Sequence, residues 1–297
     1  MKPSVGVLLV VPCLTLGACA DLIGASFGDA SLGVDAANEA SPDAAGAADA
    51  NAADEGSALP FDPSNFAGLA FWLDATSGVD VIATDAASPP VAKWHDRSGN
   101  GRDAIPIGQG TNPPALVANS LNGLPVVHFT AAASELLGAM WAGPGGTELT
   151  MFLVTRGYAE SALRFQSTTG AYPFVILPID VNSNEANPDY YFYVGTTQGP
   201  TQTQTTLRTL MQSGVELVTA QWGADGTATT FRDGVLVEQR VALDPSLPTN
   251  QALYIGGAMP ASYFANGDIA EALVYATLLD PASRIQVEAY LREKWGI

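Results

Sequence analysis

The stretch that decides the fold is DIAEALVYATLLDPASRIQVEAYLREKWGI, residues 268–297 at the end of the chain. Its first part, 268–276, is an apolar run with β-branched and aromatic residues, which is typical of a β-strand. Asp280 and Pro281 then provide a helix N-cap and a proline at the first helical position. The sequence therefore predicts one strand followed directly by one helix.

The predicted helix has a single apolar stripe. Four residues follow one another at positions i, i+3, i+4 and i+8: Val287, Tyr290, Leu291 and Trp295. Gly296 ends the helix. Because an amphipathic helix must cover its apolar stripe, we expect it to pack against the sheets that the preceding strands form.

Strand-like runs fill most of the chain before this point. They are bounded by Gly, Pro, Asn and Asp and lie at 68–75, 124–130, 148–158, 172–179, 190–195, 214–222, 228–241 and 252–258. Asp233-Gly234 supplies the two positive-φ positions of a type I′ hairpin turn, and Asn122-Gly123 predicts a second tight turn. The pattern predicts an all-β fold over residues 59–297, a two-sheet antiparallel jelly-roll sandwich with one C-terminal amphipathic helix.

The N-terminus carries an export signal. Met1 and Lys2 precede an apolar stretch shorter than the roughly 20 residues that span a bilayer, which is typical of a secretory signal. Residues 16–19, LGAC, resemble the lipobox of bacterial lipoprotein signals. The resemblance implies removal of residues 1–18 and lipidation of Cys19, and several acyl chains together give stable anchoring. A plain secretory signal with a coincidental cysteine is the alternative.

Residues 19–58 are predicted to be a disordered acidic tether after the lipidated cysteine. Positions 20–58 contain mostly Ala, Asp, Gly, Asn, Ser and Glu, with neither Lys nor Arg, so they cannot bury enough apolar surface to fold. Ala20 follows Cys19, and by the sorting rule of enteric bacteria this implies transfer to the outer membrane. We therefore expect a protein of the bacterial cell envelope that contacts the membrane only through its lipid.

The charge balance limits the class of partner. The formal net charge is −18; eight of the 30 acidic residues lie in 20–58, and one of the 12 basic residues is Lys2. Residues 59–297 thus keep 22 acidic and 11 basic residues, a balance of −11. Without a basic stripe for phosphates, the sequence excludes nucleic acid as a partner, and it disfavours polyanionic glycans.

Several motifs occur in a fixed order along the chain. FWLDA (71–75), KWHDRSGNGRDA (93–104) and LNGLPVVHF (121–129) precede YIGG (254–257) and the C-terminal strand and helix. This order resembles the bacterial laminin-G-like branch of the concanavalin A-like lectin/glucanase superfamily. The resemblance covers roughly residues 65–297 and implies a jelly roll of two curved antiparallel sheets, often associated with carbohydrate binding.

The polar loop at 93–104 has two interpretations. Asp96 and Asn100 offer oxygen ligands of the kind that Ca²⁺ prefers, and the resemblance implies that Asp268 or Glu271 completes such a site. However, Asp and Asn beside glycines are also what a tight turn requires on its own. A plain structural turn and one structural Ca²⁺ both stay open.

Catalytic signals are weak in this sequence. The glucanases of the superfamily carry their acids as E-x-D-x-E on one strand, and the sequence contains no such run. His95, Asp96 and Ser98 lie too close along the chain to converge as a triad. His128, inside a strand, is expected to be satisfied by packing. We therefore predict a protein that is not an enzyme.

A glycan site needs an aromatic platform for the apolar faces of sugars, and polar groups for their hydroxyls. Tyr191 and Tyr193 lie on one face of their run by two-residue alternation. Trp141 and Trp222 are further candidates, and core packing is the alternative for each of these aromatics. We predict a domain that binds a polysaccharide or glycoconjugate without catalysis. The alternatives are a structural or adhesion module for another envelope protein, and a divergent glycan hydrolase or lyase.

The three other tryptophans have a structural assignment. Each lies in a motif that the resemblance marks as part of the scaffold: Trp72, Trp94 and Trp295. We expect all three in the core.

Overall fold

The computed structural model describes residues 61–82, 85–107, 112–133, 135–139, 141, 143, 145–158, 161–166, 174–180, 190–195, 204–208, 214–241, 252–257 and 264–297. The chain divides into two units, Met1–Gly56 and Ser57–Ile297, and every described residue lies in the second. The predicted signal, Cys19 and the tether fall outside the described residues. Within the described part, no helix has the length and apolar character that crossing a bilayer requires.

The first sheet contains eight strands among the described residues, and all their pairings are antiparallel. In spatial order they are β15 (Val235–Val241), β14 (Thr227–Arg232), β13 (Val215–Trp222), β8 (Leu149–Tyr158), β17 (Asn266–Tyr275), β6 (Leu124–Phe129) and β5 (Ala115–Leu121). The eighth, β1 (Leu69–Asp74), pairs with the second half of β17, whose first half pairs with β6. The last strand is therefore the centre of this sheet.

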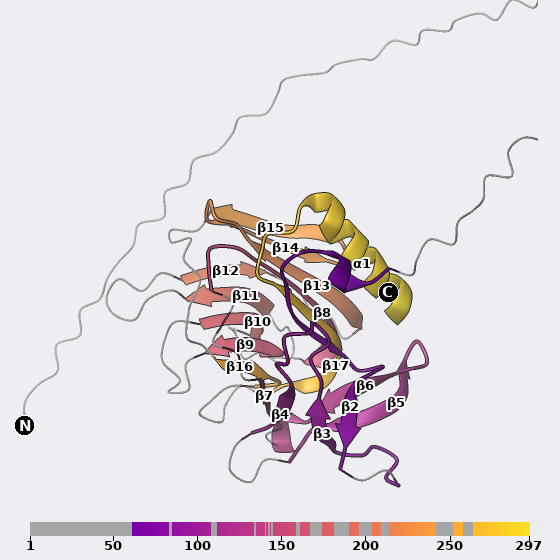
Figure 1. The fold of residues 1–297 in the computed structure, drawn as a ribbon. Helices are drawn as coiled ribbons and strands as arrows, with labels where there is room; N and C mark the ends of the chain where they lie inside the picture. The colour runs from indigo at the N-terminus through magenta and orange to yellow at the C-terminus, as the bar shows by residue number, and fades with distance from the viewer. Residues whose placement is uncertain are drawn as a thin grey trace, which may run out of the picture. The chain divides into compact units, whose positions relative to one another are not determined.

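The second sheet contains nine strands in the described part of the chain, again all antiparallel (Figure 1). Their order is β12 (Gln204–Arg208), β11 (Tyr190–Gly195), β10 (Phe174–Asp180), β9 (Leu163–Gln166), β16 (Ala252–Ile255), β7 (Leu137–Ala139), β4 (Ala104–Pro106), β3 (Val91–Trp94) and β2 (Val79–Val81). Two short 3₁₀ turns, Pro63–Asn65 and Ala131–Ala133, complete the described elements besides the helix.

One apolar core joins the two sheets. Trp141 lies 6.0 Å from Phe71 of β1 and 4.9 Å from Phe165 of β9, measured between ring centroids. The three tryptophans assigned to the core are buried, as predicted: Trp72, Trp94 and Trp295. These contacts confirm the predicted all-β sandwich.

Helix α1 (Pro281–Trp295) follows β17 and packs on β13 and β8 (Figure 1). The Asp280 carboxylate accepts hydrogen bonds from the backbone N–H groups of Ala282 and Ser283, so the predicted N-cap is confirmed. Gly296 ends the helix in the left-handed conformation, at φ 71°. Three of the four stripe residues are fully or almost fully buried: Val287, Leu291 and Trp295.

Both predicted hairpin turns are present. Asp233 and Gly234 have φ values of 50° and 82° between β14 and β15, as a type I′ turn requires. Asn122 and Gly123, at 45° and 74°, connect β5 to β6 in the same way. The second turn positions the two strands that carry one wall of the pocket described below.

Candidate ligand-binding site

Glu271 is the centre of a buried polar cluster beneath α1. Its exposed fraction is 0%, and its two oxygens accept hydrogen bonds from the indole N–H groups of Trp72 and Trp295, each at 2.8 Å. Tyr290 Oη at 3.0 Å and Lys294 Nζ at 2.7 Å complete the set. Burial raises the pKa of Glu271, and the Lys294 charge opposes this shift.

Asp74 of β1 extends the same cluster. Lys294 Nζ lies 2.9 Å from its Oδ1, and Arg97 pairs with its Oδ2. Burial works against ionisation of Asp74, but the Lys294 charge and hydrogen bonds from Thr76 outweigh it, so the pKa of Asp74 lies below its ordinary value. The motif FWLDA (71–75) thus meets residues 267–271 of β17 and residues 294–296 at the end of α1, and the cluster ties β1, β17 and α1 together.

The loop at 93–104 is organised by its own side chains. Asp96 Oδ1 accepts from the backbone N–H groups of Trp72 (3.0 Å) and Ser98 (2.9 Å), and Asp96 Oδ2 accepts from that of Arg102 (3.0 Å). Asn100 Nδ2 donates to the carbonyl of Ala70 at 3.1 Å. These are the contacts of a tight turn fastened to β1.

The four predicted calcium ligands do not form one cluster. Asp96 and Asn100 bond to backbone groups, Glu271 lies beneath α1 among N–H and O–H donors, and Asp268 pairs with other side chains. Among the residues that the structure describes, no group of three or more His, Cys, Asp or Glu is arranged to hold a metal ion. The geometry therefore assigns each of these side chains a partner within the protein.

The predicted aromatic platforms are placed as follows. Trp222 has an exposed fraction of 0%, so its ring belongs to the core and is not a surface platform. Trp141 is 9% exposed, and the Arg102 guanidinium lies 4.4 Å from its ring centroid, which leaves little face for a sugar. Tyr191 and Tyr193 lie in β11, but their side chains fall outside the described part of the structure.

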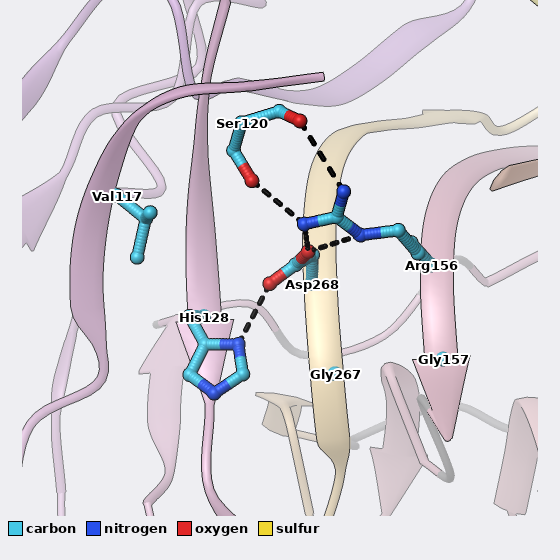
Figure 2. A pocket seen from close by; sticks show the side chains of 7 residues that line it. All are labelled: Val117, Ser120, His128, Arg156, Gly157, Gly267 and Asp268. Atoms are coloured by element: carbon cyan, nitrogen blue, oxygen red, sulfur yellow. Dashed lines mark hydrogen bonds and ion pairs between the residues drawn. The ribbon is translucent and has the colours of Figure 1, made fainter. Parts of the chain in front are cut away.

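A pocket of about 510 Å³ opens across β5, β6, β17 and β8 (Figure 2). Its lining residues are Val117, Ser120, His128, Arg156, Gly157, Gly267 and Asp268. Gly157 and Gly267 face each other in the register of β8 and β17. A Cβ atom at Gly157 would lie 3.4 Å from the Gly267 Cα atom, so the two strands approach closely here. Because both lining residues are glycines, they form a backbone floor in this part of the pocket.

One wall of the pocket is a network around Asp268. Arg156 donates to Asp268 Oδ2 from Nε at 2.7 Å and from Nη2, and His128 Nδ1 lies 2.7 Å from Asp268 Oδ1. Arg156 also donates to Ser120, from Nη2 to Oγ at 2.7 Å and from Nη1 to the carbonyl at 3.2 Å. Figure 2 shows these four side chains converging from four neighbouring strands.

The side chains of the network differ in their exposure to solvent. The side chains of His128 and Arg156 are 42% and 38% exposed, whereas that of Asp268 is 6% exposed. Glu135 lies close enough to interact electrostatically with His128, and its Oε2 accepts from the Thr130 N–H. Burial raises the pKa of Glu135, with the Thr130 hydrogen bond and His128 opposing the shift.

Sequence reasoning missed the role of two residues in this pocket. His128 was expected to be satisfied by packing, but it lies half exposed and bonds to Asp268. Arg156 was not singled out, although a lone arginine near the end of the apolar run 148–158 is a signal for a paired charge. Asp268, which the sequence analysis offers as a calcium ligand, is the hydrogen-bond partner of both.

Residues 149–283 match the family model described as the concanavalin A-like lectin/glucanases superfamily, which confirms the resemblance over this segment. Among curated proteins, none matches the sequence of this chain.

Several solved structures are similar to this chain. Domain 4 of AbnA, a GH43 extracellular arabinanase from Geobacillus stearothermophilus, in complex with arabinotriose, has 14% identity and a TM-score of 0.46, with 69% of this chain and 99% of that chain covered. A GH54 α-L-arabinofuranosidase soaked with a cyclic sulfate inhibitor has 13% identity and a TM-score of 0.48, with 77% and 60% covered. The NanB sialidase from Streptococcus pneumoniae has 9% identity and a TM-score of 0.37, with 48% and 24% covered. This chain thus spans about a quarter of the NanB chains (26% and 24%).

Proposed function

We propose that this chain, whose residues 149–283 belong to the concanavalin A-like lectin/glucanase superfamily, is a lipid-anchored protein that binds a polysaccharide or glycoconjugate without catalysis. The observation that carries this proposal is the pocket between β5 and β8, where a backbone floor meets a wall of charged and hydroxyl groups. We place the glycan-binding site there and not at Trp141 or Trp222.

The pocket suits a sugar ring in size and in chemistry. A volume of about 510 Å³ lies within the usual range of small-ligand sites. The floor at Gly157 and Gly267 lets a ring approach the backbone closely, because no side chain projects there. Arg156 and Ser120 offer hydrogen bonds to polar substituents, while Val117 and the half-exposed ring of His128 can cover apolar C–H groups.

The same geometry favours binding over catalysis. Glycoside hydrolysis uses two carboxyl groups that flank the scissile bond, one to protonate the leaving oxygen and one to act on the sugar or on water. Asp268, the carboxylate of this pocket, is almost fully buried and accepts from both Arg156 and His128. A carboxylate held in this way orients its donors and is poorly placed to transfer a proton to a glycosidic oxygen.

A glycan array tests the binding proposal. The full chain with Cys19→Ser, which lacks the lipid acceptor, is applied to arrays of bacterial and plant polysaccharides. We expect a restricted set of saccharide ligands, with no change in the length of any bound oligosaccharide on prolonged incubation. An array without ligands would contradict the binding proposal and favour an adhesion module, and shortening of an oligosaccharide would contradict the absence of catalysis.

Metabolic labelling tests the lipid anchor. Cells that express the full chain are grown with an alkyne-bearing palmitate, and the protein is then isolated and assayed for the label. We expect incorporation into the unmodified chain and into Cys13→Ala, and none into Cys19→Ala, because only Cys19 follows the LGA sequence of a lipobox. Labelling of Cys19→Ala would contradict the proposed anchor.

A further inference from the structure

We infer that the pocket selects a sugar that carries a carboxylate, such as a uronic acid, over the corresponding neutral sugar. This inference rests on the proposed glycan binding at the same pocket, and it follows from which hydrogen-bonding groups of the pocket are already used and which are left. It names the chemical class of ligand, which neither the fold nor the family match specifies.

The Asp268 carboxylate is engaged within the protein. Asp268 accepts two hydrogen bonds from Arg156 and one from His128 and is only 6% exposed. Because an ionised carboxylate only accepts, the Nδ1 atom of His128 is the donor in this pair. The buried carboxylate is thus turned toward its own partners, and it offers little to the hydroxyl hydrogens of a ligand.

The groups left over are donors. Arg156 has five N–H groups, and its four hydrogen bonds to Asp268 and Ser120 leave one N–H on the Nη1 atom. Ser120 Oγ accepts from Arg156, so its own hydroxyl hydrogen is available to a ligand.

A ligand that matches the remaining N–H of Arg156 and the hydroxyl of Ser120 must bring acceptors. A carboxylate accepts at two oxygens, and hydrogen bonds from an arginine to a carboxylate are roughly twice as strong as those between neutral groups. A neutral hydroxyl in the same place accepts fewer hydrogen bonds, and because it carries no charge its hydrogen bond from Arg156 is weaker. The sugar ring would then extend over the backbone floor at Gly157 and Gly267.

The surrounding charges favour one carboxylate over many. Arg156 balances Asp268 within the pocket, and Glu135, which interacts electrostatically with His128, opposes added negative charge. Beyond the pocket, residues 59–297 carry a balance of −11, as counted above. A single carboxylate interacts mainly with the donors within a few ångströms of it. A polyanion extends over the acidic surface and is repelled by it.

Paired ligands test this inference on the full chain with Cys19→Ser. Methyl glucuronide is compared with methyl glucoside, and methyl galacturonide with methyl galactoside, by calorimetric titration at pH 6. We expect at least one uronide to bind about 10-fold or more tightly than its neutral partner, in line with the greater strength of hydrogen bonds to charged groups. Sodium acetate is titrated separately to measure a carboxylate without a sugar.

Two variants and a pH series link the effect to the pocket. Arg156→Lys keeps the positive charge but removes the planar guanidinium group with its several N–H donors, so we expect the uronide to bind about 10-fold more weakly. Arg240→Lys, on the exposed edge strand β15, is the matched control and should bind as the unmodified chain does. Uronide affinity should rise as the pH falls through the raised pKa of Glu135, because the loss of its negative charge removes a repulsion of the ligand carboxylate.

Each outcome separates this inference from the proposed function. Equal affinity for uronides and neutral sugars would contradict the inference and leave glycan binding intact. Arrays on which only neutral saccharides bind would have the same consequence. Acetate binding as strong as uronide binding would also contradict the inference, because the site would then recognise carboxylate alone. If no sugar binds in either experiment, glycan binding itself is wrong and the inference falls with it.

Discussion

Replacing Lys294 by methionine is expected to destabilise the domain strongly. The Lys294 side chain is 16% exposed, and its ammonium group lies 2.7 Å from Glu271 Oε2 and 2.9 Å from Asp74 Oδ1. Methionine matches the length of the side chain, so the main change is that two almost completely buried carboxylates lose their shared cation. Removing one partner of a buried ion pair costs about 3–5 kcal/mol.

The assay is denaturant unfolding combined with calorimetry. For a domain of this size, a loss of that magnitude lowers the melting temperature by about 6–20 °C. Arg240→Met is the control, because Arg240 pairs with Glu238 on an exposed strand and such pairs contribute about 0–1 kcal/mol. A cost for Lys294→Met as small as that of Arg240→Met would refute the reasoning.

A double-mutant cycle isolates the ion pair from the other contacts of Lys294. Glu271→Gln removes the charge and keeps an oxygen that can accept from one of the two indole N–H groups. Once residue 271 is neutral, removal of Lys294 takes a cation from Asp74 alone. Asp74 still pairs with Arg97. The double variant should therefore lose less stability than the sum of the two single variants, by about 0.5–3 kcal/mol. Additive losses would show that the two groups do not interact.

Three further predictions concern other parts of the domain. Gly256→Ala should destabilise it far more than Gly99→Ala: both glycines have φ near +80°, but a Cβ at Gly256 would lie 2.3 Å from the Phe129 ring, while that at Gly99 meets nothing within 4 Å. Urea midpoints measure this difference, and equal losses would contradict it. Glu135→Gln should raise the stability at neutral pH, because burial raises the pKa of Glu135 and so disfavours its charged form in the folded state. This advantage should shrink as the pH falls through the raised folded-state pKa toward the ordinary value of 4.5, and an advantage that grew on acidification would contradict the sign. A chelator should leave the melting temperature unchanged, since the Asp96 oxygens already accept hydrogen bonds from the turn, and stabilisation by added calcium would overturn this expectation.

Local chemistry explains why much of the fold could be predicted. The turns at Asp233-Gly234 and Asn122-Gly123 need two consecutive positive-φ residues, and few residue types adopt that conformation easily. The helix begins at an Asp-Pro pair for an equally local reason, because Asp280 accepts from the first N–H groups of α1. Signals of this kind depend on neighbours within a few positions, and the sequence displays them directly.

The roles of the buried acids depend on contacts far apart in the sequence. Glu271 and Trp72 are separated by 199 positions and bond only because β1 pairs with β17. From the sequence alone, a carboxylate that binds calcium and one that is neutralised by a lysine look the same. The resemblance marks Glu271 as a candidate calcium ligand, and only the packing shows that its hydrogen-bond partners are N–H and O–H groups of the protein.

The candidate pocket depends on one irregularity of β17. In a regular strand, residues three positions apart point to opposite faces, so Asp268 and Glu271 should lie on different sides of the sheet. The register with β8 shifts between Ile269 and Glu271, so that Asp268 pairs with Arg156 and Glu271 with Val154. Arg156 and Val154 are two positions apart on β8 and therefore share a face.

This shift places the buried polar cluster around Glu271 and the pocket on the same face of the first sheet. Tyr290 and Lys294 of α1 cover that face at Glu271, while the pocket at Asp268 is open to solvent. One strand thus fastens the helix at one end and presents a charged network to solvent at the other. A two-residue alternation read from the sequence would separate these two acids, and only the bulge brings the scaffold and the proposed binding site onto one surface.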